Sequence, residues 1–98
     1  MTYSEKMLKA LHGENLAEAQ LMFAEALRKD DEDTLAELGE ELLSIGFLEE
    51  AKQIFEQLIA VFPDAEGLNL PLAEIAIEDD QFDEALAYLE KVPQDSPS

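Results

Sequence analysis

The residues of this sequence that could do chemistry are a single histidine and many carboxylates. His12 is the only histidine, and the sequence contains no cysteine. Nucleophilic or acid–base catalysis needs a base placed beside a nucleophile, and no serine or cysteine nucleophile motif accompanies His12. His12 precedes Gly13 near an expected helix end, where a cation complements the helix dipole. We therefore predict no catalytic residue and no enzyme.

Two acidic runs have the composition of calcium loops. They are Asp30–Asp33 and Asp79–Asp83. A calcium-binding loop alternates its oxygen ligands, has a glycine at its sixth position and ends on a glutamate. Counted from Asp31 the sixth residue is Ala36, and counted from Asp79 it is Glu84, so both runs fail the pattern. No glycine-rich phosphate loop is present either. The sequence predicts no metal and no cofactor, and the acidic runs are interpreted as turns with acids at helix N-termini.

The charge of the chain is strongly negative, with 24 acids and 6 bases giving a net charge of −18. Residues 1–31 hold six acids and four bases, whereas residues 32–65 and 66–98 each hold nine acids and one base. Such a surface repels nucleic acid and anionic membranes and attracts basic proteins or peptides. The alternative, that acidic helix faces merely keep the domain soluble, stays open. Since no apolar run approaches the roughly 20 residues of a membrane span or resembles a signal peptide, we expect a cytoplasmic protein.

Residues recur along the chain at a spacing of 34. The pairs are Ala51 and Ala85, Leu38 and Leu72, Leu48 and Phe82, Leu58 and Val92, and Pro63 and Pro97. Within the middle unit, apolar residues follow the three- and four-residue steps of helices. They are Leu35, Leu38, Leu42 and Ile45 on one helix, and Ala51, Ile54, Phe55, Leu58, Ile59 and Phe62 on the next. We predict an all-α fold of about three antiparallel helix pairs in one domain, 1–98, with units of approximately 1–31, 32–65 and 66–98.

Several residues predict where these helices begin and end. Thr34 and Glu37 have the spacing of a capping box, and Gly46 suits a left-handed C-cap. Pro71 lacks an amide proton and Gly67 weakens the preceding turn, so the helix that contains 70–78 should start late, near Leu68, or kink. Pro93 is expected to end the last helix early.

The middle unit resembles the tetratricopeptide repeat, whose pattern is W-x2-L-G-x2-Y, then A-x3-F, then P. It reads Leu35-x2-Leu38-Gly39-x2-Leu42, then Ala51-x3-Phe55, then Pro63. The third unit matches less well, through Leu72, Ala73, Ala76, Ala85, Leu89 and Pro97, and the first through Leu16, Ala19, Phe23 and Ala26 with a loop about two residues shorter. The resemblance implies a right-handed superhelical solenoid in which Gly39 and Ala51 allow close helix packing and Phe55 packs between units. It also implies a non-catalytic scaffold for protein–protein interaction.

The first helix of each pair lines the concave side of such a solenoid. One residue beyond the core stripe turns about 100° around the helix axis. Starting at Ala36, one residue after Leu35, the i, i+4 and i+7 steps of this second face select Ala36, Glu40 and Leu43, and a further 34 residues select Leu70, Glu74 and Ile77. We predict that these six residues form a groove for a basic or amphipathic protein segment. Family members that grip an acidic peptide tail use Lys, Asn and Arg here, so the two acids predict the opposite preference. Alternatively, the aliphatic residues only pack on neighbouring helices.

No capping helix follows the third unit, although solenoids normally end in one. Phe82, Leu86 and Leu89 are therefore expected to lie partly exposed. One interpretation is that the chain is the N-terminal piece of a longer array whose binding site lies elsewhere. The other is that this face is covered by self-association, giving a homo-oligomer.

Overall fold

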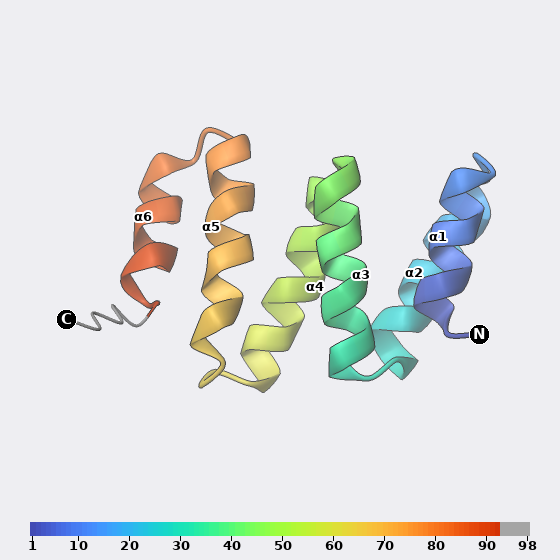
Figure 1. Cartoon of the computed structure of the whole chain (residues 1–98), viewed down its shortest axis with the longest axis horizontal. Helices are drawn as coiled ribbons and strands as arrows, with labels where there is room; N and C mark the ends of the chain where they lie inside the picture. The colour runs from blue at the N-terminus through green and yellow to red at the C-terminus, as the bar shows by residue number, and fades with distance from the viewer. Residues whose placement is uncertain (93–98) are drawn as a thin grey trace.

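A computed structural model describes residues 1–92, and in that range the chain is entirely helical (Figure 1). The helices are α1 (Tyr3–His12), α2 (Leu16–Lys29), α3 (Glu32–Ile45), α4 (Leu48–Val61), the short 3-10 helix η1 (Glu66–Leu68), α5 (Asn69–Glu78) and α6 (Phe82–Glu90). No strand occurs in the described residues. The prediction of six main helices and no sheet is confirmed for residues 1–92.

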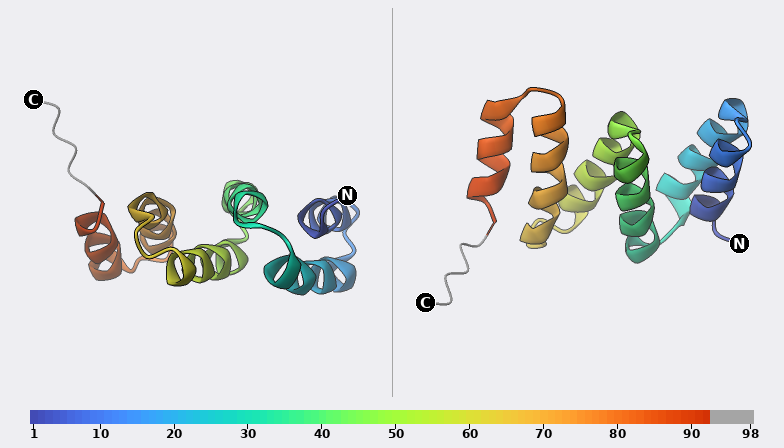
Figure 2. Two further views of the ribbon diagram at one scale, coloured as in Figure 1. Left: turned by 90° about the horizontal axis from the view of Figure 1, so that it is seen from below. Right: turned by 45° about the horizontal axis from the view of Figure 1, so that its top comes forward.

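The six helices form three antiparallel pairs, α1 with α2, α3 with α4, and α5 with α6. Helices α1, α3 and α5 lie along one side of the molecule and α2, α4 and α6 along the other (Figure 2, left). The body measures 46 × 27 × 22 Å. The start of α6 follows that of α4 by 34 residues, while α4 follows α2 by 32, as the shorter first loop predicts. The right-handed superhelical twist stays a prediction.

The core contains most of the stripes that the periodicity predicts for α3 and α4, but Ile45, at the end of the predicted α3 stripe, is 45% exposed and lies outside the core. Leu35, Leu38 and Leu42 are buried on α3. They pack in one cluster with Ala51, Ile54, Phe55 and Leu58 of α4. Phe62, which the periodicity placed on this inner side, is 41% exposed, so that prediction is wrong. The physical reason is that Pro63 disfavours helical backbone at the preceding residue. Phe62 has φ −123° and ψ 71° and therefore leaves the helical stripe.

The predicted start of α3 is also wrong. The helix begins at Glu32, and its N-cap is Asp31, whose carboxylate accepts a hydrogen bond of 2.8 Å from the Thr34 amide. Aspartate is at least as good an N-cap as threonine, and capping at position 31 adds most of a helical turn. The capping box that the structure contains joins Thr2 and Glu5 at the start of α1. Gly46, in contrast, is the predicted left-handed C-cap, with φ 96°.

The late start of α5 is confirmed. Its first residue, Asn69, follows η1, so Pro71 lies in the first turn, where a missing amide proton leaves no helical bond unmade. Helix α5 is apolar on nearly every side, with Glu74 and Glu78 as its only charged residues before the turn to α6. Helix α6 ends at Glu90. Pro93 and Pro97, on which the predicted C-terminal stop and the end of the third unit rest, lie outside the described residues.

Candidate protein-binding surface

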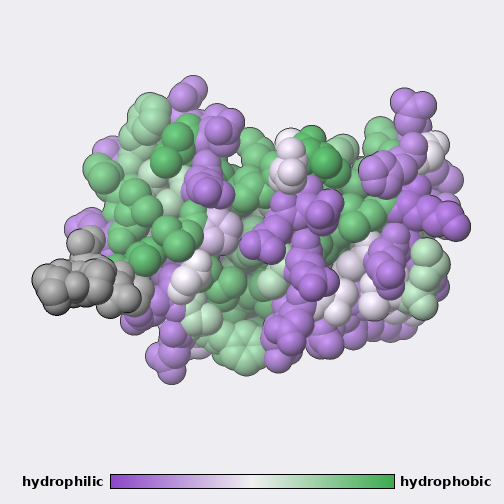
Figure 3. All heavy atoms as spheres, in the orientation of Figure 1, coloured by the Kyte–Doolittle hydropathy of each residue, from purple (hydrophilic) through white to green (hydrophobic). Residues whose placement is uncertain are grey.

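Helices α3 and α5 run in the same direction along one side of the molecule, with α4 behind them (Figure 1). Helix α5 packs mainly on α6 and α4 and makes little contact with α3. Two hollows open beside α3, one between the C-terminal ends of α3 and α5, and one between the N-terminal end of α3 and the turn that leads from α4 through η1 to α5. We call the two together the α3–α5 trough. In Figure 3 the strip between these helices is largely apolar, while a column of hydrophilic side chains follows α3.

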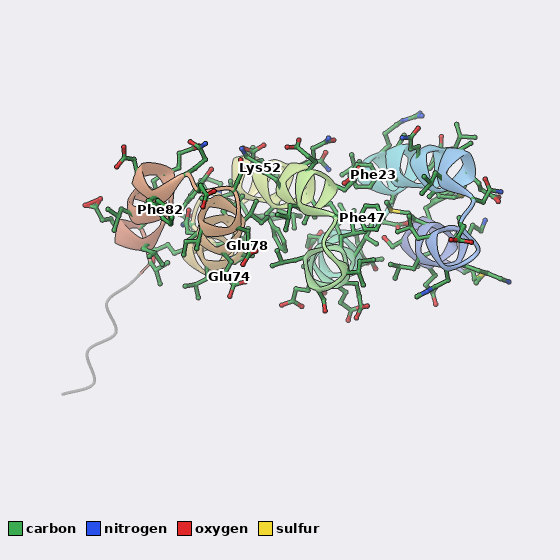
Figure 4. All side chains as sticks on the ribbon, turned by 90° about the horizontal axis from the view of Figure 1, so that it is seen from above. Phe23, Phe47, Lys52, Glu74, Glu78 and Phe82 are labelled. Atoms are coloured by element: carbon green, nitrogen blue, oxygen red, sulfur yellow. The ribbon has the colours of Figure 1, made fainter. Side chains whose placement is uncertain are left out.

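The upper hollow, near the C-terminal ends, has a volume of about 670 Å³. Its lining residues are Leu43, Ser44, Ile45, Gly46, Leu48, Glu74, Ile77 and Glu78. Leu43 of α3 is half-buried and Ile77 of α5 is exposed, so aliphatic surface faces solvent from both walls. Glu74 and Glu78 lie on the flank of α5 turned away from α6 (Figure 4). The hollow therefore combines apolar walls with two carboxylates on one edge.

The lower hollow has a volume of about 600 Å³ and a more apolar lining. It is lined by Glu32, Asp33, Ala36, Leu58, Val61, Phe62, Pro63, Asp64, Ala65 and Leu68. Leu58 belongs to α4, as Leu48 does in the upper hollow, so α4 forms the floor at both ends. Phe62 and Val61 expose much of their side chains here because α4 ends beside them. Three carboxylates, from the start of α3 and the turn after α4, border this apolar surface.

The acids of the trough have no basic neighbour among the residues that line it. In residues 1–92 the ion pairs join Glu25 to Arg28 at 3.3 Å and to Lys29 at 3.0 Å, both on α2. The hydrogen bond from Lys29 lowers the pKa of Glu25, and the same bond raises the pKa of Lys29. Lys52, the base of the middle unit, lies on the opposite side of the molecule from Glu74 (Figure 4). The trough therefore presents uncompensated negative charge to any partner.

A second exposed apolar surface lies on α6. Phe82, Leu86 and Leu89 follow a helical stripe and are 58%, 60% and 39% exposed, which confirms the exposure predicted from the sequence. The neighbouring stripe of α6 carries the buried Ala85 and the half-buried Tyr88. Burial raises the pKa of the Tyr88 phenol, with a smaller contribution from the charge of Glu56. The apolar sector of α6 is thus wider than the part that α4 and α5 cover. On the face shown in Figure 3, apolar surface gathers over α5 and α6.

A family model for the tetratricopeptide repeat matches residues 42–98, which is more than half of the chain. The chain belongs to the tetratricopeptide repeat family. No curated protein and no solved structure matches it. The matched region contains α4, α5 and α6, and tetratricopeptide repeats generally mediate protein–protein interaction. None of the helices in residues 1–92 has the length and apolar character that a membrane span requires.

The structure distributes the six predicted groove residues over four places on the tetratricopeptide repeat domain. Leu43, Glu74 and Ile77 line the upper hollow. Ala36 lines the lower hollow, at the other end of the trough. Leu70 is exposed on α5 but lines neither hollow. Glu40 faces the opposite way, into a hollow between α1 and α3 that also contains Glu37 and Glu41.

Sequence reasoning missed the residues that give the lower hollow its apolar lining. Val61, Phe62 and Leu68 lie at the end of α4 and in η1, where helical periodicity no longer describes which side chains are exposed. One signal was present, since Phe62 directly precedes Pro63 and such residues leave the helical conformation. This position before a proline would have placed Phe62 outside the core.

Proposed function

We propose that this tetratricopeptide repeat domain is a non-catalytic scaffold that binds a basic, amphipathic protein segment in the α3–α5 trough. The observation that carries the proposal is the composition of the upper hollow. Leu43 and Ile77 offer apolar contact from two different helices, while Glu74 and Glu78 supply charge of one sign beside them. Buried apolar anchors would provide most of the affinity, and the carboxylates would favour Lys or Arg and reject acidic partners.

The shape of α5 supports the same proposal. A helix that is apolar on nearly every side is normally buried on nearly every side. Helix α5 is covered by α4 and α6 but leaves Leu70 and Ile77 exposed, and Ile77 lines the upper hollow. A bound segment would cover this surface. Nucleic acid and anionic membranes would be repelled by the same acids, and the cytoplasmic location inferred from the sequence stays a prediction.

Charge reversal with a matched control tests this proposal. The probe is a fluorescent amphipathic peptide of Lys and Leu, compared with a Glu and Leu peptide of the same pattern. We expect Glu74→Lys plus Glu78→Lys to weaken binding of the basic peptide, and the difference to shrink as salt screens the charges. The control, Glu37→Lys plus Glu41→Lys, makes the same change in net charge at the same spacing on the α1–α3 side. If both pairs of substitutions weaken binding of the basic peptide equally, a site in the trough is refuted, and a general attraction to the acidic surface explains the binding.

The exposed stripe of α6 favours a second candidate function, a structural one. Phe82, Leu86 and Leu89 could pack against another copy of the chain or against further repeats of a longer protein. Because each copy carries a charge of −18, self-association should strengthen as salt rises. Sedimentation measured over a range of protein and salt concentrations tests this. Leu86→Glu should abolish association, whereas Leu21→Glu, at a 65% exposed position on α2, should not. A monomer under all conditions would reject self-association.

A further inference from the structure

The two hollows of the trough are separated by a distance that a ligand must match. On α3 the hollows are marked by Ala36 and Leu43, which are seven residues apart. At a rise of 1.5 Å per residue this separation is about 10 Å. On the other wall, Leu68 and Ile77 are nine residues apart, which corresponds to roughly 13 Å. Apolar side chains that occupy both hollows must therefore stand about 10–13 Å apart along the ligand.

The polar groups of the trough select between a helical and an extended ligand. An extended segment exposes its own carbonyl groups and needs hydrogen-bond donors in the groove. The side chains lining the two hollows are, apart from Ser44, either apolar or carboxylates, and none is Asn, Gln, Lys or Arg. Carboxylates accept hydrogen bonds but do not donate them. A helix bonds its own carbonyl groups internally and has no such need, except at its ends.

Both ends of the trough are acidic. Glu74 and Glu78 border the upper hollow. Glu32, Asp33 and Asp64 border the lower one. A ligand with cationic residues beyond both of its apolar anchors would place each cation near a carboxylate group, whereas a ligand with acids at either end would be repelled.

We propose that the ligand of the trough is an amphipathic helix with large apolar side chains at positions i and i+7, and with Lys or Arg beyond each of them. Seven residues of helix span about 10 Å and return to nearly the same face, because 3.6 residues make one turn. One apolar side chain enters each hollow, beside Ile77 at the upper end and Phe62 at the lower end. This inference rests on the proposed function and specifies the ligand of that site.

Three fluorescent peptides of Lys, Leu and Ala test the helical register. The first has Leu at i and i+7, the second has the same composition with Leu at i and i+5, and the third is the first with a central proline that breaks the helix. Affinities are measured by anisotropy at low and moderate salt, and helix formation by circular dichroism. We expect the first peptide to bind roughly tenfold more tightly than the other two and to become more helical when bound.

Two protein variants locate the anchors. Ile77→Ser removes apolar surface from the upper hollow and Phe62→Ser from the lower one, and both residues are already exposed, so folding should be preserved. The control is Leu21→Ser on α2. Each hollow variant should remove most of the difference in affinity between the i, i+7 peptide and the i, i+5 peptide, and the control should leave that difference unchanged.

The outcomes separate the two proposals. If all three peptides bind equally and Glu74→Lys plus Glu78→Lys weakens them all, the trough binds basic segments but the helical register is wrong. If the proline peptide binds as tightly as the first, the ligand is extended and the inference is overturned. If no peptide binds, or if no trough variant changes the affinity of any peptide, both the inference and the proposed function fail.

Discussion

Gly39 allows α3 to approach α4 closely, which makes its substitution a sensitive test of the packing. A Cβ atom at position 39 would lie 2.7 Å from Cζ and 2.9 Å from Cε2 of Phe55, and 3.3 Å from Cγ2 of Ile54. Phe55 is almost fully buried, so its ring has little room to move away. We predict that Gly39→Ala destabilises the domain, although alanine is the better helix former.

The magnitude follows from two opposing effects. Replacing glycine by alanine inside a helix contributes about 1 kcal/mol of stability. Overpacking a full core costs about 1–3 kcal/mol, and the contacts below 3.0 Å place this site near about 3 kcal/mol. The expected net loss is therefore about 2 kcal/mol. Phe55→Ala, which empties the same space, should cost about 3–5 kcal/mol.

The double variant, Gly39→Ala plus Phe55→Ala, distinguishes this specific contact from a general sensitivity of the core to substitution. With Phe55 reduced to alanine, the new Cβ at position 39 meets no ring and keeps only the 3.3 Å approach to Cγ2 of Ile54, so most of the helix-propensity gain of about 1 kcal/mol remains. The two substitutions should thus couple by about 3 kcal/mol, with the double variant more stable than additivity predicts. Gly67→Ala is the control, since a Cβ there meets nothing within 4 Å.

Urea unfolding followed by circular dichroism measures all four proteins and the control. Equal m-values across the set would show that the denatured state is unchanged. A Gly39→Ala variant more stable than the parent, or a cycle additive to within about 0.5 kcal/mol, would refute the predicted contact between Gly39 and Phe55.

Three further predictions concern other contacts of the structure. Asp30→Ala should cost about 1–3 kcal/mol in urea unfolding because it leaves the buried Ser4 hydroxyl and amide unpaired, whereas Asp30→Asn, which keeps an acceptor, should cost less. Pro71→Ala should change the unfolding free energy by less than about 1 kcal/mol, since Pro71 lies in the first turn of α5. Burial raises the pKa of Tyr88, so the neutral phenol is favoured in the folded state, and the free energy of unfolding should fall as the pH rises through and above the ordinary pKa range of tyrosine. Unfolding measured as a function of pH should show a smaller fall at alkaline pH for Tyr88→Phe.

The sequence by itself determined the helices, their pairing and most of the core. Helical periodicity is a local property, and the burial of one stripe on each helix follows from it. For that reason Leu38, Leu42 and Phe55 were placed correctly, as were the left-handed Gly46 and the late start of α5 at Pro71. The exposure of Phe82 and Leu86 on α6 also agrees with the sequence-based prediction.

Only the tertiary structure decided which residues meet across helices. Asp30 accepts hydrogen bonds from the Ser4 amide at 2.8 Å and hydroxyl at 2.7 Å, joining the first turn of α1 to the turn before α3, and no local pattern encodes this contact. Likewise, periodicity placed Glu40 and Leu43 on one face of α3, yet Glu40 faces α1 and Leu43 faces α5. A helical face is set by residue spacing, but its neighbours depend on how far apart the helices lie and at what angle they cross, and that is settled by the packing of the whole core.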